Sequence, residues 1–382
     1  MNTIAYAIYI AKNGIVHTNE FQEKPDMEGQ FNARTSNLPW AELDNRPKIG
    51  MLALENEDEA LAEACAYVAK YEDVHFFYFS PKDIDFDEML IRGYFYENKK
   101  WIPKIVEYPD VIYDRLRLRG IKGYNIVYQE LEGIPFTNEF FGNSISKLEV
   151  YDKLADTGVF NDVLIPYQKV DRTRDIFNYI DKFGQVILKP EVGSFAQGVH
   201  FISKEKNDQY FVAIGDKEEY YNELSLSNYL RELIKKGTFI VQKYIETRTI
   251  DGQPFDIRVH MMKDGNGEWS FVKIYPRIGV YYATIVITRK GGYVGNINGF
   301  LERNYGKENV YKLRKQIETL STELVTHFES IYDKNINEIA LDLAIDKKLN
   351  PKLIEINVNK PGIVYYEFDV AKHAIEYAKY LA

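Results

Sequence analysis

A hairpin near the end of the chain constrains the fold more than any other part of the sequence. The segments EIALDLAI and KLIEINV flank a polar turn at residues 346–351, as expected for two antiparallel strands. With that turn, Ile345 pairs with Lys352, and Asp342 lies opposite Glu355. Cross-strand partners share one face of a sheet, with Cβ atoms ~5 Å apart. The sequence therefore predicts two carboxylates side by side on one face of a hairpin.

The face that carries these acids also carries an amide. Asn357 follows Glu355 by two positions on the strand, so both side chains point the same way. Ile354 and Ile356 then point to the opposite face. Unpaired acids would repel one another there, and Mg²⁺ favours carboxylate and amide oxygens as ligands. We therefore predict that Asp342, Glu355 and Asn357 bind Mg²⁺; the alternative is a solvated polar face on an ordinary hairpin.

A lysine at the end of an apolar strand precedes a glycine-containing segment. QVILKP ends in Lys189 and Pro190 and continues into EVGSFAQGV. Gly193 and Gly198 keep side chains out of this segment, so its backbone N–H groups, including that of Ser194, can cradle phosphate oxygens. Lys189 would add a flexible positive charge. The alternative is a surface turn beside an exposed lysine, since the pattern is neither the Walker motif nor GxGxxG.

Two arginines are expected on one strand face further along the chain. FDIRVH places Asp256 and Arg258 on the same side of a strand, and Arg277 lies across the hairpin that turns at residues 264–267. Their guanidinium groups could converge on phosphate or carboxylate oxygens. Surface ion pairs with Asp256 are the alternative.

An apolar strand that precedes these arginines is a candidate for binding a nucleotide base. The segment FIVQKYI (239–245) is apolar enough to line an adenine slot, with main-chain groups at residues 243–245 free to contact the base. An ordinary core strand is the alternative.

The rest of the pattern predicts an α/β (α+β) chain in two main parts. Residues 1–46 form an extension with an N-terminal hairpin, residues 47–142 an α/β domain with parallel strand pairing, and residues 143–382 a second domain. Strands are expected at residues 48–54, 74–80, 110–116, 185–190 and 238–245, and helices at residues 57–71, 144–158, 222–237 and 303–333.

Composition excludes several classes of protein. The 382 residues carry a net charge of -9, which disfavours a nucleic-acid partner because phosphate backbones need a basic face. The single cysteine, Cys65, allows neither an intramolecular disulfide nor a thiolate zinc site. No stretch approaches ~18 uncharged apolar residues, and the first residues lack a signal peptide's basic region. We therefore expect no membrane partner and a cytoplasmic location.

Taken in order, these motifs resemble the ATP-grasp superfamily, and within it the spore-coat-associated YheC/YheD-type proteins. The order is a lysine-bearing helix, a strand lysine with a glycine loop, an apolar hinge strand, DxR and Asp…ExN. The resemblance extends from about residue 47 to the C-terminal region. YPDVIYDRLRLRG resembles a PDVVYDR-type segment that Arg115 matches, and FGNSISKLEVYDKL resembles the start of the ATP-binding region, with Leu148 where tryptophan is usual. ITRKGGYVGNINGF resembles a TN…GG segment in altered order.

The resemblance implies an ATP-grasp fold with ATP and Mg²⁺ as cofactors. An α/β domain would precede an ATP-binding subdomain at residues 143–240 and a metal and substrate subdomain at residues 241–382. The implied nucleotide contacts are Lys147, Lys189, Gln242, Lys243, Tyr244, Ile245, Asp256 and Arg258. The implied substrate contacts are Arg115, Arg277, Thr288, Asn296 and Asn298.

The activity that the resemblance implies is ligation of a carboxylate to an amine through an acyl phosphate. Lys189, Arg258 and Arg277 would neutralise charge during phosphoryl transfer. The expected partners are a small-molecule or peptide carboxylate and an amine acceptor. Three alternatives stay open: a non-catalytic nucleotide-binding scaffold of the spore-coat type, an ATP-grasp phosphotransferase, and a plain α/β binding protein.

Overall fold

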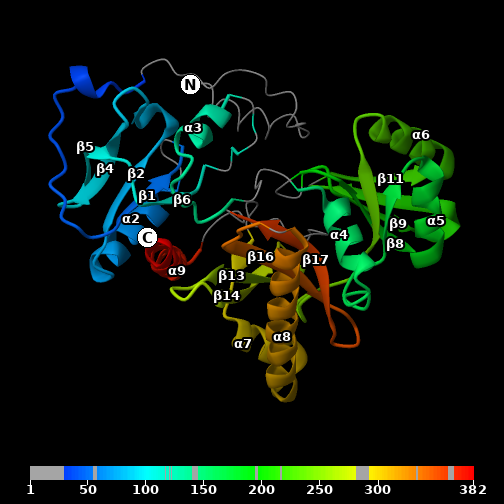
Figure 1. The fold of residues 1–382 in the computed structure, drawn as a ribbon. Helices are drawn as coiled ribbons and strands as arrows, with labels where there is room; N and C mark the ends of the chain where they lie inside the picture. The colour runs from blue at the N-terminus through cyan, green and yellow to red at the C-terminus, as the bar shows by residue number, and fades with distance from the viewer. Residues whose placement is uncertain are drawn as a thin grey trace.

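The computed structural model describes most of the chain. The described residues are 30–54, 58–116, 118–119, 121, 123–139, 145–193, 197–215, 217–280, 292–332, 334–359 and 365–382. The expected N-terminal hairpin, Ser194 and Thr288 lie outside these ranges. Three sheets carry the architecture, each with its own helices (Figure 1). None of the helices in the described ranges is both long and apolar enough to cross a membrane.

The first sheet has the predicted parallel centre. Its strand order is β3-β4-β2-β1-β6, with β5 added on β4. β1 pairs in parallel with both β2 and β6, and α2 connects β1 to β2, as the strand–helix–strand pattern predicted. The elements are β1 (Lys48–Leu52), α2 (Glu59–Tyr71), β2 (His75–Phe79), β3 (Ile84–Asp85), β4 (Leu90–Glu97), β5 (Lys100–Glu107), β6 (Val111–Asp114) and α3 (Asn125–Glu130).

The sequence prediction missed the β4–β5 hairpin of this sheet. The two strands pair antiparallel from Leu90 with Glu107 to Glu97 with Lys100. Asn98 and Lys99 form the connection with positive φ angles of 50° and 61°, the geometry that two-residue hairpin turns require. A lysine at the second turn position is not a usual signal for that turn, because it is neither glycine nor asparagine.

The second sheet is antiparallel, with the order β11-β10-β9-β8-β12-β7. Two helices, α5 and α6, pack on it through a core that includes Ile176, Ile180, Leu226 and Leu230. The elements are α4 (Lys147–Asp156), β7 (Tyr167–Val170), α5 (Thr173–Phe183), β8 (Gln185–Pro190), β9 (His200–Lys204), β10 (Gln209–Ile214), β11 (Lys217–Asn222), α6 (Glu223–Ile234) and β12 (Phe239–Lys243).

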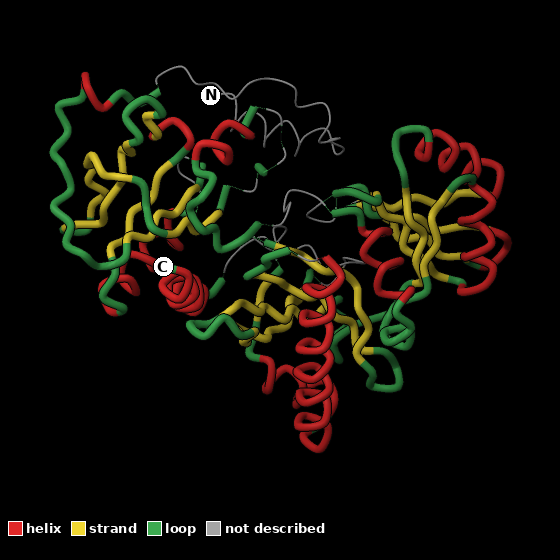
Figure 2. Tube along the Cα trace, in the orientation of Figure 1, coloured by secondary structure: helices red, strands yellow, loops and turns green. Residues whose placement is uncertain are grey.

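The third sheet, also antiparallel, carries most of the candidate site residues. Its order is β15-β14-β13-β16-β17, and α8 covers one face (Figures 1 and 2). The elements are β13 (Phe255–Lys263), β14 (Trp269–Ile278), β15 (Tyr293–Val294), α7 (Ile297–Tyr305), α8 (Lys307–Tyr332), β16 (Glu338–Ile345) and β17 (Pro351–Val358). The helix expected at residues 303–333 is divided: Gly306, with φ 85°, separates α7 from α8.

The last helix joins the third sheet to the first. α9 (Glu367–Leu381) packs against α2 in a core that also contains Met262 of β13 and Val272 of β14. Small residues such as Ala374 and Ala62 line this contact and let the two helices approach closely. The C-terminal helix is therefore part of the interface between two sheets, a long-range contact that periodicity alone does not predict.

Candidate functional site

The predicted pairing of Asp342 with Glu355 is confirmed, but a β-bulge produces it. Ile345 pairs with Pro351 and not with the expected Lys352. From this start, an unbroken ladder would place Asp342 opposite Ile354. The pairing with Glu355 therefore requires one additional residue in β17.

That additional residue is Ile354. Leu343 pairs with Leu353 and the next pair is Asp342 with Glu355, so Ile354 has no partner of its own. A one-residue change of register moves side chains to the opposite face of a strand. Without the bulge, Glu355 would face the core. The bulge therefore puts Glu355 and the polar positions that follow it on the face of Asp342.

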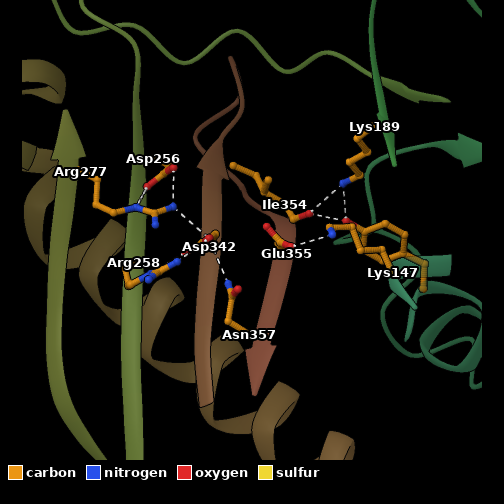
Figure 3. Close-up of polar contacts among 10 residues, drawn as sticks. Lys147, Lys189, Asp256, Arg258, Arg277, Asp342, Ile354, Glu355 and Asn357 are labelled. Carbon is orange, nitrogen blue, oxygen red and sulfur yellow. Dashed lines mark hydrogen bonds and ion pairs between the residues drawn. The ribbon is translucent and has the colours of Figure 1, made fainter. Parts of the chain in front are cut away.

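A row of buried ion pairs crosses β14, β13 and β16 on this face (Figure 3). Arg258 donates through Nε and Nη2 to the two oxygens of Asp342 at 2.8 and 2.9 Å. Arg277 makes the same fork with Asp256 at 2.6 and 2.7 Å, and its Nη2 also lies 2.9 Å from Asp342 Oδ2. Both arginines thus contact the carboxylate of Asp342, whereas their predicted contact with phosphate or carboxylate oxygens of a ligand stays a prediction. The alternative is right that Asp256 forms an ion pair with an arginine, but the pair is buried and does not lie at the surface.

The charges around the two aspartates explain the opposite shifts of their pKa values. Burial raises the pKa of Asp256 above its ordinary value, and the pull of Arg277 does not fully offset this. Burial also opposes ionisation of Asp342, but Arg258 and Arg277 together outweigh it and hold the pKa of that carboxyl low. Asp342 is thus the better candidate for a permanently charged ligand.

The side chains of the three predicted metal ligands divide between two sets of contacts. Asn357 Nδ2 donates to Asp342 Oδ2 at 3.3 Å, whereas the Glu355 carboxylate turns to Lys147, with Nζ to Oε1 at 3.4 Å. No cluster of three acidic, histidine or cysteine side chains in the described ranges is arranged to hold a metal. Nearby arginine and lysine cations neutralise the two carboxylates, and the metal set of two carboxylates and an amide stays a prediction.

The donor chemistry of this face nevertheless fits Mg²⁺. Glu355 is partly exposed, with 30% of its side-chain surface accessible, and the amide oxygen of Asn357 is a second hard donor on the same strand. Mg²⁺ commonly takes only one or two protein carboxylates and completes its shell with phosphate oxygens and water. Glu355 and Asn357, with Asp342 beside them, would hold such an ion.

Lys147 and Lys189 approach β17 from α4 and from the second sheet (Figure 3). Lys147 is the first residue of α4, and its Nζ donates to the Gly193 carbonyl at 2.7 Å. Lys189, at the end of β8, is 6% exposed and donates to Gln242 Oε1 at 2.9 Å and to the Ile354 carbonyl at 3.4 Å. The interpretation of Lys189 as an exposed surface lysine is therefore wrong.

Burial changes the ionisation of Lys189. It lowers the pKa of the ammonium from the ordinary 10.5 to about 8, although the negative charges of Glu355 and Asp342 oppose the shift. The free protein therefore carries a charged Lys189 below about pH 8 and a neutral amine above it. Only the charged form attracts a phosphate.

We expect the affinity for ATP to fall as pH rises above about 8. Bound phosphate would raise the pKa of Lys189, so binding takes up a proton in this range and the dissociation constant rises by up to about tenfold per pH unit. The stability of the free protein changes in the opposite sense. Because the unfolded chain binds the extra proton between about pH 8 and about 10.5, the destabilisation caused by burying Lys189 diminishes as pH rises through that window.

Fluorescence titration with ATP between about pH 7 and about 9.5 tests this prediction. The control is Lys189→Arg, whose guanidinium does not titrate in this range; its affinity should depend much less on pH. A wild-type affinity that stays constant over the whole range would contradict the assignment of Lys189 to the phosphates.

The glycine segment and the hinge strand flank Lys189. Gly198 has φ 67°, and a Cβ there would lie 3.0 Å from Pro190. His200, at the start of β9, bonds to the Gly198 carbonyl through Nδ1 at 2.8 Å and to Tyr229 through Nε2 at 2.7 Å. The far end of the glycine segment is therefore anchored to α6.

The expectation that main-chain groups at residues 243–245 are all free is wrong. The Lys243 amide donates to Pro166 at 2.9 Å, and the Tyr244 amide donates to Gln185 at 3.1 Å. These bonds fix the end of β12 against its neighbours. Of the predicted hinge residues, Gln242 is buried and accepts from Lys189, and Ile245 is half-buried.

Arg115 was expected to contact substrate, but the structure gives it a different setting. Its side chain is fully buried, and Nη1 donates to Glu338 Oε2 at 2.8 Å, while Nε lies 3.3 Å from Asp58 Oδ2. Glu338 in turn contacts His260 Nε2 at 2.9 Å. Arg115 thus ties the first sheet to the third, and a substrate could not reach it in this arrangement.

Two other predicted substrate residues have local roles. Asn296 caps α7 by accepting from the Gly299 amide at 3.1 Å, and Asn298 accepts from Arg314 at 3.2 Å. Both side chains are exposed. These hydrogen bonds lie within α7 and between α7 and α8, and the substrate contacts of both residues stay predictions.

The sequence analysis missed one residue at the centre of the site. Tyr151 of α4 is buried, accepts from Lys189 Nζ at 2.8 Å and donates to the Ile354 carbonyl. The signal available in the sequence was its spacing: it follows Lys147 by four positions, so both lie on one helix face.

Comparison with known proteins gives the family. The YheC/D like ATP-grasp family matches residues 133–381. The endospore coat-associated proteins YheD and YheC of Bacillus subtilis (strain 168) are 23% and 26% identical to this chain. The matches cover 80% of this chain and 70% of YheD, and 82% of this chain and 88% of YheC.

Among solved structures, D-alanyl-alanine synthetase A from Vibrio cholerae O1 biovar eltor aligns with a TM-score of 0.47 and 12% identity. The alignment covers 88% of this chain and 99% of that one, a similarity too distant to bear on activity. The family match spans well over half of the sequence, including the second and third sheets and the whole arginine and carboxylate row. The chain therefore belongs to the YheC/D-like ATP-grasp family.

Proposed function

We propose that this protein is an ATP-dependent ligase that joins a carboxylate to an amine through an acyl phosphate. The observation that carries the proposal is the row of cations on one sheet face. Arg258 and Arg277 converge on Asp342 at 2.8–2.9 Å, and Lys147 and Glu355 meet beside them at 3.4 Å. Phosphoryl transfer depends on this combination of positioning and charge neutralisation.

The residues of the row would divide the work between binding and charge stabilisation. Lys147 and Lys189 would hold nucleotide phosphates at the ATP-binding side, and Glu355 and Asn357 would hold Mg²⁺ on β17. Bound Mg·ATP would supply the γ-phosphoryl group that converts a carboxylate into an acyl phosphate, whose phosphate the amine then displaces. Arg277 and Arg258 would neutralise the charge that develops on the transferred group.

Two other functions use the same nucleotide site. A phosphotransferase would stop at a phosphorylated product, and a scaffold would bind nucleotide without turnover. One observation favours the scaffold: the curated relatives YheC and YheD are described as endospore coat-associated proteins. The set of buried, mutually bonded charges favours the ligase. Burying these charges costs free energy, and a protein that only binds nucleotide does not require them.

Formation of ADP from ATP and Mg²⁺ tests the proposal. A panel of amino acids and peptides is offered as carboxylates, with and without amine acceptors. The ligase predicts ADP formation that requires a carboxylate and becomes sustained when an amine is added. ADP formation with an acceptor that has no carboxylate would indicate a phosphotransferase, and no turnover with detectable ATP binding would favour the scaffold.

A further inference from the structure

One tyrosine hydroxyl connects the ATP-binding side of the site to the metal side. Tyr151 lies one helical turn after Lys147 on α4, and its ring is 1% exposed. The hydroxyl accepts from Lys189 Nζ at 2.8 Å and donates to the Ile354 carbonyl. The direction of both bonds is fixed, because an ammonium can only donate and a carbonyl can only accept.

The carbonyl that Tyr151 contacts belongs to the bulge. Ile354 is the residue of β17 without a partner on β16, and a bulge leaves backbone groups that the ladder does not satisfy. Tyr151 and Lys189 both donate to this carbonyl. Two side chains of the ATP-binding subdomain therefore hold the bulge from outside the sheet, and Figure 3 shows the contact between Lys189 and Ile354.

The bulge determines where the carboxylate of Glu355 points. If Ile354 slipped into the ladder opposite Asp342, Glu355 would turn toward the core and the metal face would lose its exposed carboxylate. Lys147 contacts Glu355 at 3.4 Å from the same helix face as Tyr151, so α4 contacts two successive residues of β17.

We propose that Tyr151 is a positioning residue, which holds the Ile354 bulge so that Glu355 faces the Mg²⁺ of bound Mg·ATP. Its role in turnover rests on the proposed function, whereas its role in metal-dependent nucleotide binding does not. Tyr151 touches neither ATP nor the reacting carboxylate. It acts through the backbone of β17, and Lys189 keeps a second partner in Gln242 when the hydroxyl is removed.

The test is Tyr151→Phe, which keeps the ring and its packing and removes only the hydroxyl. The matched control is Tyr167→Phe, because the centroids of the Tyr167 and Tyr151 rings lie 5.0 Å apart. The Tyr167 hydroxyl donates to Asp152 at the surface and not to β17. ATP binding is titrated at increasing Mg²⁺ concentration, and amide hydrogen exchange is followed across β17 without nucleotide.

For Tyr151→Phe we expect the Mg²⁺ concentration that half-saturates the enhancement of ATP binding to rise about tenfold, as for loss of one buried hydrogen bond. ATP affinity without Mg²⁺ should change less than about threefold, and exchange at Ile354–Asn357 should be faster. Tyr167→Phe should match the wild type in all three measurements, with a similar melting temperature in both variants.

Two results would overturn the proposal. One is a Mg²⁺ dependence and a β17 exchange rate in Tyr151→Phe that equal those of the wild type. The other is equal losses in both variants, which would mean a general packing effect. A wild type that binds Mg·ATP but forms no acyl phosphate would overturn the proposed ligase, while the binding and exchange data would still decide the role of Tyr151.

Discussion

Replacing Glu355 with glutamine is expected to lower turnover by at least about a hundredfold, the loss typical when a group that stabilises transferring charge is removed. The change keeps the size of the side chain but removes the charge that Mg²⁺ requires. Glu355 is partly exposed, and among the described residues its ion pair is with Lys147 at 3.4 Å, so the fold should tolerate the change. Mg²⁺ should also lose its effect on the thermal stabilisation by ATP.

The control for this variant is Glu232→Gln, which removes an exposed carboxylate from α6 that pairs with Lys235. Its turnover and its Mg²⁺ response should equal those of the wild type. Full activity of Glu355→Gln would remove Glu355 from the metal site and leave its contact with Lys147 as an ordinary ion pair.

A second large effect is expected for stability. Arg115→Met should lower the free energy of unfolding by about 3–5 kcal/mol, the usual cost of removing one partner from a buried charge pair. Both Arg115 and Glu338 have fully buried side chains, so the variant removes the permanent positive charge that contacts the Glu338 carboxylate at 2.8 Å. The pair joins the residue that follows β6 of the first sheet to the first residue of β16 in the third.

Urea unfolding measures this effect, with Arg46→Met as the control. Arg46 makes ion pairs with Asp44 and Asp73 at the surface, and such pairs contribute little to stability. A loss as small for Arg115→Met as for Arg46→Met would contradict the structural role. The substrate contact that the sequence suggested for Arg115 would then regain support.

The elements that the sequence predicted well are those set by local pattern. The parallel β1–α2–β2 unit follows from an apolar strand, a helical repeat and a second apolar strand. The β13–β14 hairpin follows from its glycine-rich turn, but the opposition of Asp256 and Arg277 also needs the register shift between His260 and Met261. Each of these depends on residues close together in the chain.

The features that the sequence predicted poorly depend on residues that are far apart in the chain. The pairing of Asp342 with Glu355 came from the wrong turn register, which the bulge at Ile354 compensates; no residue in LIEIN signals an extra position. The burial of Lys189 depends on Tyr151, 38 positions earlier, and on Ile354, 165 positions later. Arg115 meets Glu338 across 223 positions.

The central claim is that a carboxylate is activated by phosphorylation, and oxygen transfer tests it most directly. Substrate is prepared with ¹⁸O in its carboxylate, and the released inorganic phosphate is analysed by mass spectrometry. The ligase predicts one labelled oxygen in each phosphate, because the carboxylate oxygen that attacks the γ-phosphorus leaves with it when the amine displaces the phosphate. Phosphate without label, formed at the same rate as product, would contradict the acyl-phosphate mechanism.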